Sequence, residues 1–211
     1  MTCRRRVRLL PLAPLLLSAL VLAGCGGRDV RPDTVPDTTS WSALYKGRFT
    51  SPEGETSRFR AWVWAAPADR LHVEVFGPMG GTRLAVDGGQ GMLAVSLVQD
   101  KVAYAGDVAG LPLSAVFGVS MTLEQTVSAL TGAGRPPGLT VWRRDAGEGD
   151  RLPLRLHVGS GDSLLELTRL AVRDLPAERT AALGTGRPPD GMSVRPLSEL
   201  LDAGGAGPVS Y

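Results

Sequence analysis

The chain has 211 residues, enough for one or two domains, and 23 lysines and arginines nearly balance 21 aspartates and glutamates. This balance argues against the basic face of a nucleic-acid-binding protein, and two cysteines and two histidines leave little for a closed zinc site. Glycine (27 residues), proline (16) and a low aromatic content (5%) favour a turn-rich β protein over a helical bundle.

Residues 1–24 have the pattern of a secretory signal peptide. Arg4, Arg5, Arg6 and Arg8 precede an apolar stretch, residues 9–22, which is shorter than the roughly 20 residues of a membrane-spanning helix. The stretch ends in Leu-Ala-Gly-Cys, which resembles a bacterial lipobox, so cleavage before Cys25 would leave that cysteine as an acylated N-terminus. The alternative is an ordinary secretory signal followed by a chance cysteine.

Processing at this site would change the chemistry of the chain. It removes four arginines and no acidic residue, so the mature protein becomes slightly negative. It also removes Cys3, which leaves only the acylated Cys25 and therefore no intramolecular disulfide. Gly26 after the cysteine favours, by analogy, delivery to the outer membrane, where the anchored protein would face the periplasm. Residues 25–40 then form a lipidated, flexible tether.

Folded structure is expected to begin near Trp41, where the apolar pattern takes a period of two. Phe59, Ala61 and Val63, for example, alternate with arginines and tryptophans. Short alternating segments divided by glycine-rich or charged turns predict an antiparallel meander. The expected strands are 43–50, 57–65, 70–76, 82–87, 92–98, 101–105, 139–143, 152–158 and 164–172, with a turn at 87–89.

Two short helices are expected to interrupt these strands. Residues 109–118 carry apolar residues at helical spacing, and Thr122 with Gln125 forms a possible capping box for a second helix that ends at Gly132. The half-barrel domain is placed at 41–175, and residues 176–211 form a partly disordered C-terminal extension with a helical turn or two near 196–202. The fold class is mainly β (α+β), an antiparallel sheet curved into an incomplete barrel whose concave face is filled by side chains or by a ligand.

No catalytic constellation is visible in the sequence. Ser160 lies in a predicted hairpin turn and lacks the Gly-x-Ser-x-Gly pattern, while His72 and His157 are interpreted as solvated strand residues. We therefore expect no enzyme activity, no metal site, no cofactor and no nucleic-acid partner. An acylated protein without catalytic residues points to binding or to scaffolding.

Several features follow one another in order between residues 41 and 172. A strand ends at Trp64, the next runs into Gly77-Pro78-Met79-Gly80, and Gly118, Leu123 and Gly132 follow. This order resembles the LolB family of outer-membrane lipoproteins, which accept other lipoproteins from a periplasmic carrier and which have Pro-Leu-Gly at the turn and a similar spacing of the later residues. The resemblance implies a helical lid over an apolar cavity that holds acyl chains, and a loop residue, here Met79, that contacts the membrane. The cavity residues would be Leu71, Val73, Val75, Leu84, Val86, Leu93, Val95 and Leu97, with Leu113, Val116 and Phe117 from the lid.

The resemblance also implies the partners. They are a periplasmic carrier similar to LolA, the acyl chains of lipoproteins and the membrane that holds the acylated Cys25, with the chain itself a monomer. Two readings remain open at this point. The same apolar residues would instead form a plain core, as in a lipid-anchored structural or assembly component. Separately, Met79 would fold back onto the sheet instead of contacting the membrane.

Overall fold

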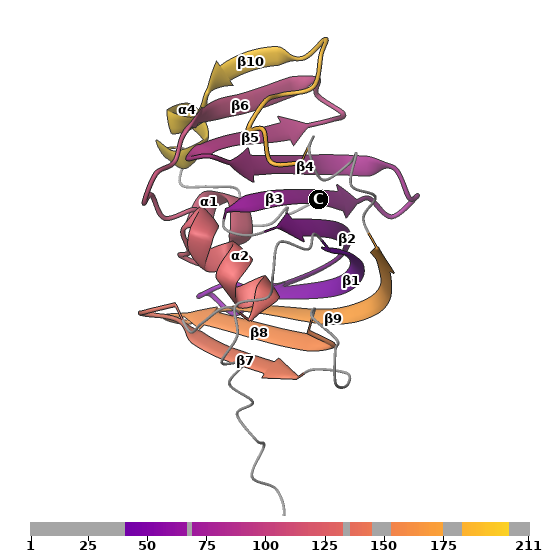
Figure 1. Ribbon diagram of the computed structural model, residues 1–211, viewed down its shortest axis with the longest axis vertical. Helices are drawn as coiled ribbons and strands as arrows, with labels where there is room; N and C mark the ends of the chain where they lie inside the picture. Colours follow the sequence, from indigo (N-terminus) through magenta and orange to yellow (C-terminus); the bar gives the residue numbers. More distant parts are fainter. Residues whose placement is uncertain (1–40, 67–68, 133–135, 145–152, 175–182, 203–211) are drawn as a thin grey trace, which may run out of the picture. The chain divides into compact units, whose positions relative to one another are not determined.

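The computed structural model describes residues 41–66, 69–132, 136–144, 153–174 and 183–202 (Figure 1). In this part of the chain, ten strands form one sheet in the order β10-β6-β5-β4-β3-β2-β1-β9-β8-β7. The strands are β1 (Trp41–Thr50), β2 (Thr56–Ala66), β3 (Arg70–Phe76), β4 (Thr82–Gly89), β5 (Met92–Leu97), β6 (Val102–Asp107), β7 (Thr140–Arg144), β8 (Arg155–Ser160), β9 (Ser163–Asp174) and β10 (Ser193–Pro196).

The sheet is antiparallel except at one edge, and it is open. β1 to β6 form a meander, β9 adds to β1, and β10 pairs with β6 in parallel. Within the described residues no pairing joins β7 to β10, the two ends of the strand order. The structure therefore confirms a mainly β fold whose sheet is not closed.

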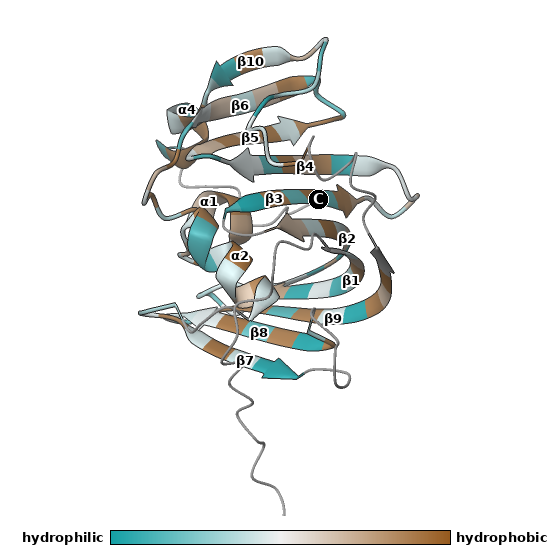
Figure 2. Ribbon diagram, viewed as in Figure 1, coloured by the Kyte–Doolittle hydropathy of each residue, from teal (hydrophilic) through white to brown (hydrophobic). Residues whose placement is uncertain are grey.

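Alternation along the strands decides which face of the sheet is apolar. Hydrophobic and hydrophilic residues alternate along most strands (Figure 2). The buried members of β1, β2 and β4, such as Tyr45, Ala61 and Val86, belong to one core. Arg58, Arg60 and Glu74 lie at the alternate positions. The period of two in the sequence thus predicts the buried face, because successive side chains of a strand point to opposite sides.

Two helices between β6 and β7 pack on the apolar face. They are α1 (Ser114–Phe117) and α2 (Leu123–Thr131), and α2 contacts β2, β3 and β8. The predicted capping box is present, since the Gln125 amide donates to the Thr122 hydroxyl and the Gln125 side chain accepts from the Thr122 amide. At the C-terminal end of α2, Arg143 Nη1 donates to the Leu130 carbonyl over 3.2 Å. A positive charge at this end also interacts favourably with the helix dipole. None of the described helices is long and apolar enough to cross a membrane.

The sheet continues beyond residue 175, where the sequence places the end of the half-barrel. Leu183 packs on Trp64 and Ala66, after which β10 pairs with β6 and α4 (Leu197–Asp202) follows. Leu197 is buried in the main core and lies close to Gly106 of β6. The helical turn expected near 196–202 is confirmed, whereas the sequence pattern did not predict a strand at β10.

Candidate functional site

An apolar cavity of about 770 Å³ lies between the inner face of the sheet and the helices. Its volume falls within the range of about 300–1,000 Å³ that is typical of small-molecule sites. Apolar side chains come from β2, β3 and β4, from β8 and β9 on the other side of the sheet, and from α2 with the preceding Met121. The main ones are Phe59, Ala61, Val63, Val73, Val75, Leu84, Val86, Leu156, Val158, Leu165, Leu167, Met121, Ala129 and Leu130.

The mouth of the cavity lies beyond the end of β3, where there is a gap beside β2. Residues 56–59 of β2 pair with β1, whereas pairing with β3 starts only at Arg60 opposite Phe76. The exposed lining residues gather around this gap: Lys46 on β1, Arg58 and Arg60 on β2, and Pro78 and Gly80 in the turn between β3 and β4. The cavity is therefore open to solvent beside this turn.

Met79 is at the tip of the same turn and is 100% exposed. Its neighbours Pro78 and Gly80 both line the cavity mouth. Met79 does not fold back onto the sheet, which was one of the two readings left open by the sequence. A fully exposed apolar side chain at the mouth of an apolar cavity is available for contact with another apolar surface.

Six of the eleven residues predicted to form the cavity line it. They are Val73, Val75, Leu84, Val86, Val116 and Phe117. The other five do not line the cavity and belong to, or pack against, the core: Leu71, Leu93, Val95, Leu97 and Leu113.

Two helices account for this division of the inner face. Leu123 of α2 and Leu93 of β5 both lie about 3 Å from the point where a Cβ on Gly88 would be, so α2 fills the space around Leu93. α4 contacts β5 and β6 and brings Leu197 into the core. Since α4 belongs to the segment that the sequence placed outside the domain, the cavity was expected too far toward β5.

The sequence pattern did not predict that β8 and β9 contribute to the cavity. Leu156 and Val158 of β8 and Leu165 and Leu167 of β9 line the cavity across from β3 and β4. Their alternation marks them as inward-facing, but it does not say which inward-facing residues border an open space. The basic mouth was also missed, although arginines at positions 58 and 60 share one face of a strand.

Every charged side chain among the described lining residues is basic. These are Lys46, Arg58, Arg60 and Arg83. The nearby Arg48 does not line the cavity and forms an ion pair with Glu166. The hydrogen bond from Arg48 is the main cause that lowers the pKa of Glu166, so this carboxylate stays ionised beside its own partner.

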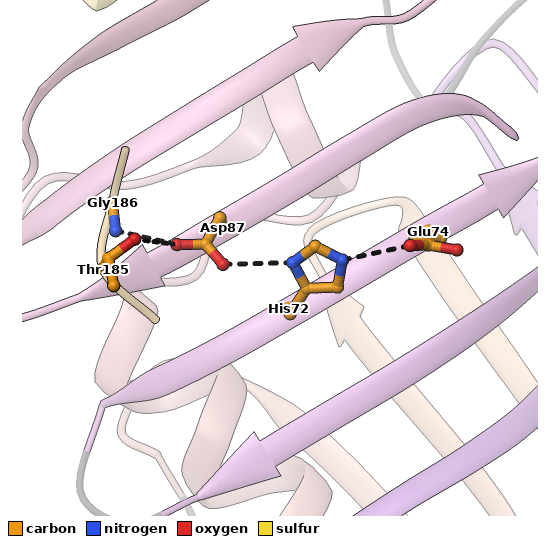
Figure 3. A network of polar contacts seen from close by, with 5 residues as sticks. All are labelled: His72, Glu74, Asp87, Thr185 and Gly186. Atoms are coloured by element: carbon orange, nitrogen blue, oxygen red, sulfur yellow. Dashed lines mark hydrogen bonds and ion pairs between the residues drawn. The ribbon is translucent and has the colours of Figure 1, made fainter. Parts of the chain in front are cut away.

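A separate polar network (Figure 3) joins residues that do not line the cavity. His72 Nδ1 is 3.0 Å from an Asp87 oxygen and Nε2 is 3.3 Å from a Glu74 oxygen. Burial alone would lower the pKa of His72, but the bonds to Asp87 and Glu74 outweigh it and raise the pKa to about 9. His72 is thus a cation fixed between two carboxylates, not the solvated residue expected from the sequence.

The C-terminal strap, residues 183–186, is tied to this network. The Gly186 amide donates to Asp87 Oδ1 over 2.8 Å, and the Thr185 hydroxyl donates to the same oxygen over 3.3 Å. His72 therefore helps to keep Asp87 ionised, and the ionised carboxylate accepts these two hydrogen bonds from the strap. In the part of the chain described, no group of three or more histidines, cysteines and acids is arranged to hold a metal ion.

Together, the fold and the site are those of an open, mostly antiparallel sheet with an apolar cavity and a basic mouth. No protein-family model matches the chain, and no curated protein matches it. Among solved structures, an uncharacterized conserved protein from Thermus thermophilus is 18% identical with a TM-score of 0.41, covering 75% of this chain and 91% of its own. The LolA superfamily protein NE2245 from Nitrosomonas europaea is 10% identical with a TM-score of 0.42, covering 68% and 90%. TM-scores this low do not establish a family, so the function proposed below depends on the cavity and its mouth.

Proposed function

We propose that this protein is a lipid-anchored acceptor that binds the acyl chains of lipoproteins in its cavity and helps insert them into the outer membrane. The observation that carries the proposal is the open apolar cavity of about 770 Å³ with the fully exposed Met79 beside its mouth. Cys25 supplies the anchor in the outer membrane, the protein faces the periplasm, and the partner is a periplasmic carrier similar to LolA.

The hydrophobic effect supplies the free energy of binding in this proposal. Each methylene that moves from water into the cavity contributes about 0.8 kcal/mol, so a chain of modest length binds without covalent chemistry. The protein acts as a monomer and not as an enzyme, because no bond of the lipid has to be made or broken. Transfer proceeds from the carrier when this cavity binds the chains more tightly than the carrier does.

The alternative, a structural or assembly component of the cell envelope, requires a filled core. The region under α4 and the first turn of α2 meets that requirement, whereas the space between β2, β3, β8 and β9 does not. The open space favours the acceptor over the structural component.

The test is a transfer assay with the full chain carrying Cys25→Ala, so that its own acyl group does not compete for the cavity. A loaded carrier from the same cell should pass its lipoprotein to the protein, detected by co-elution. Wild-type chain in outer-membrane vesicles should then deliver the lipoprotein to the bilayer, while Met79→Glu accepts but delivers at least about tenfold less, because burying Met79 contributes roughly 1.5–3 kcal/mol.

Met79→Leu is the matched control for that assay and should deliver like the wild type, because leucine is of similar size and polarity. No transfer from the carrier would refute the acceptor function. Undiminished delivery by Met79→Glu would refute the role of the loop alone.

A further inference from the structure

The basic mouth of the cavity places like charges opposite one another. Lys46 of β1 is the direct partner of Arg60 of β2, and Arg48 is the direct partner of Arg58. Like charges in such positions destabilise a sheet. Glu166 offsets this cost at Arg48 only. Repulsion between Lys46 and Arg60 therefore remains at the edge of the apolar cavity.

The other three cations of these two pairs have no acidic partner within the described residues. Lys46, Arg58 and Arg60 are exposed and form no ion pair with a described carboxylate. Arg83 adds a further positive charge from β4, across the gap from β2, where its side chain lies against Gly77. Positive charge thus flanks the mouth on both sides, with no described acid among the lining residues.

We propose that this basic mouth binds the anionic head group of an amphiphile whose acyl chains occupy the cavity. The ligand class is an anionic lipid, with a phosphate or a carboxylate at its head. The guanidinium groups of Arg58 and Arg60 match such oxyanions with paired hydrogen bonds. A bound anion also offsets the repulsion between Lys46 and Arg60. This inference rests on the acyl-chain cavity of the proposed function, but not on lipoprotein delivery.

Calorimetric titration of the full chain carrying Cys25→Ala tests the proposal with two pairs of ligands below their micelle concentrations. Dihexanoyl phosphatidylglycerol is compared with dihexanoyl phosphatidylcholine, and decanoate is compared with decanol. The chains within each pair are equal, so only the head differs. We expect the anionic member to bind about tenfold tighter, the equivalent of one charge-assisted hydrogen bond. The pair with the larger preference identifies the head as phosphate or carboxylate.

The variant Arg58→Gln with Arg60→Gln should lose this preference while binding decanol as before, which also shows that it is folded. Its matched control is Arg144→Gln with Arg155→Gln, because these two exposed arginines form another pair of like charges opposite one another, on β7 and β8, but lie outside the cavity lining. The control should keep the preference.

Equal affinity within both pairs would overturn the inference and leave the acyl-chain cavity intact. A preference that survives Arg58→Gln with Arg60→Gln, or that disappears equally in the control variant, would also overturn it. If no member of either pair binds, the proposed function fails, and the inference fails with it.

Discussion

At the scale of single residues, the ionisation of His72 connects pH to the stability of the fold. Its imidazolium lies between Asp87 and Glu74, and it packs against Trp64 in a T-shaped arrangement with ring centroids 5.0 Å apart. Burial by itself would raise the pKa of Asp87, but the bonds from His72 and the Gly186 amide lower it. Protonated His72 and ionised Asp87 therefore stabilise each other and the strap.

The pKa of about 9 predicts how stability changes with alkaline pH. A raised folded-state pKa gives a contribution that is complete below the unfolded value of about 6.5 and is lost as pH rises through about 9. The unfolding free energy from urea titration should therefore fall by on the order of 2 kcal/mol between pH 6.5 and pH 10, after discounting for partial exposure.

His72→Gln provides the comparison, because it keeps a polar side chain but does not titrate. Its pH profile should be flatter than that of the wild type by the same amount. Parallel profiles for the two proteins would show that His72 does not hold the charge described here.

The sequence could not predict this network from His72 alone. Glu74 is two positions away and on the same face, which the alternation reveals. Asp87 and Gly186 are 15 and 114 positions away, and they meet His72 or its partner only through the pairing of β3 with β4 and the path of the strap. Met79 differs, because its position between Pro78 and two glycines at a turn already marks it as a candidate for exposure.

At the scale of elements, the C-terminal strap crosses the outer face of the sheet at unusually close range. A Cβ on Gly89 would lie 2.1 Å from the carbonyl oxygen of Gly184, and a Cβ on Gly184 would lie 2.5 Å from the carbonyl oxygen of Gly88. Gly184 also has a φ of 68°, which favours glycine. Backbone packs on backbone here, so only glycine fits at these positions.

Gly89→Ala should therefore destabilise the fold by about 1–3 kcal/mol, the usual cost of overpacking a site that cannot move freely. Urea unfolding measures this difference. Gly81→Ala is the matched control, since a Cβ there meets nothing within 4 Å and no positive φ is required. Equal stability of the two variants would mean that the strap yields to the added methyl group.

The same contact explains an error in the strand boundaries expected from the sequence. The sequence pattern predicts a turn at Asp87-Gly88-Gly89, but β4 runs through Gly89 and the turn comes at Gln90 and Gly91. Gly88 and Gly89 therefore allow neighbouring segments to pack closely and do not reverse the chain. β10 was missed because its four exposed residues, one of which is Pro196, carry no alternating apolar pattern, and their pairing with β6 depends on where the chain returns.

At the scale of the whole described structure, the sequence determines an apolar inner face but not how completely it is filled. The alternation of Val73 and Val75 is the same as that of Val95 and Leu97, yet only the first pair borders the cavity. The difference arises from the helices, since α4 contacts β5 and β6, whereas Ala129 and Leu130 of α2 line the cavity together with Val73 and Val75. Packing between distant segments therefore decides where the site lies.

The central claim is that acyl chains occupy this space, and Ala129 of α2 offers a way to close it. Ala129 is 2% exposed and lines the cavity, so phenylalanine at this position would extend into the existing space. Ala85→Phe is the matched control, because Ala85 is on β4 but outside the cavity lining.

The most direct measurement is calorimetric titration with decanol of the full chain carrying Cys25→Ala, alone and combined with each phenylalanine variant. Decanol has an acyl-like chain and no charge, so it reports on the cavity independently of the basic mouth. Saturable binding should be retained with Ala85→Phe and weakened at least tenfold with Ala129→Phe, because filling the cavity removes the burial of at least two methylenes at about 0.8 kcal/mol each. Absence of decanol binding in the starting protein, or equal binding in both variants, would contradict the central claim.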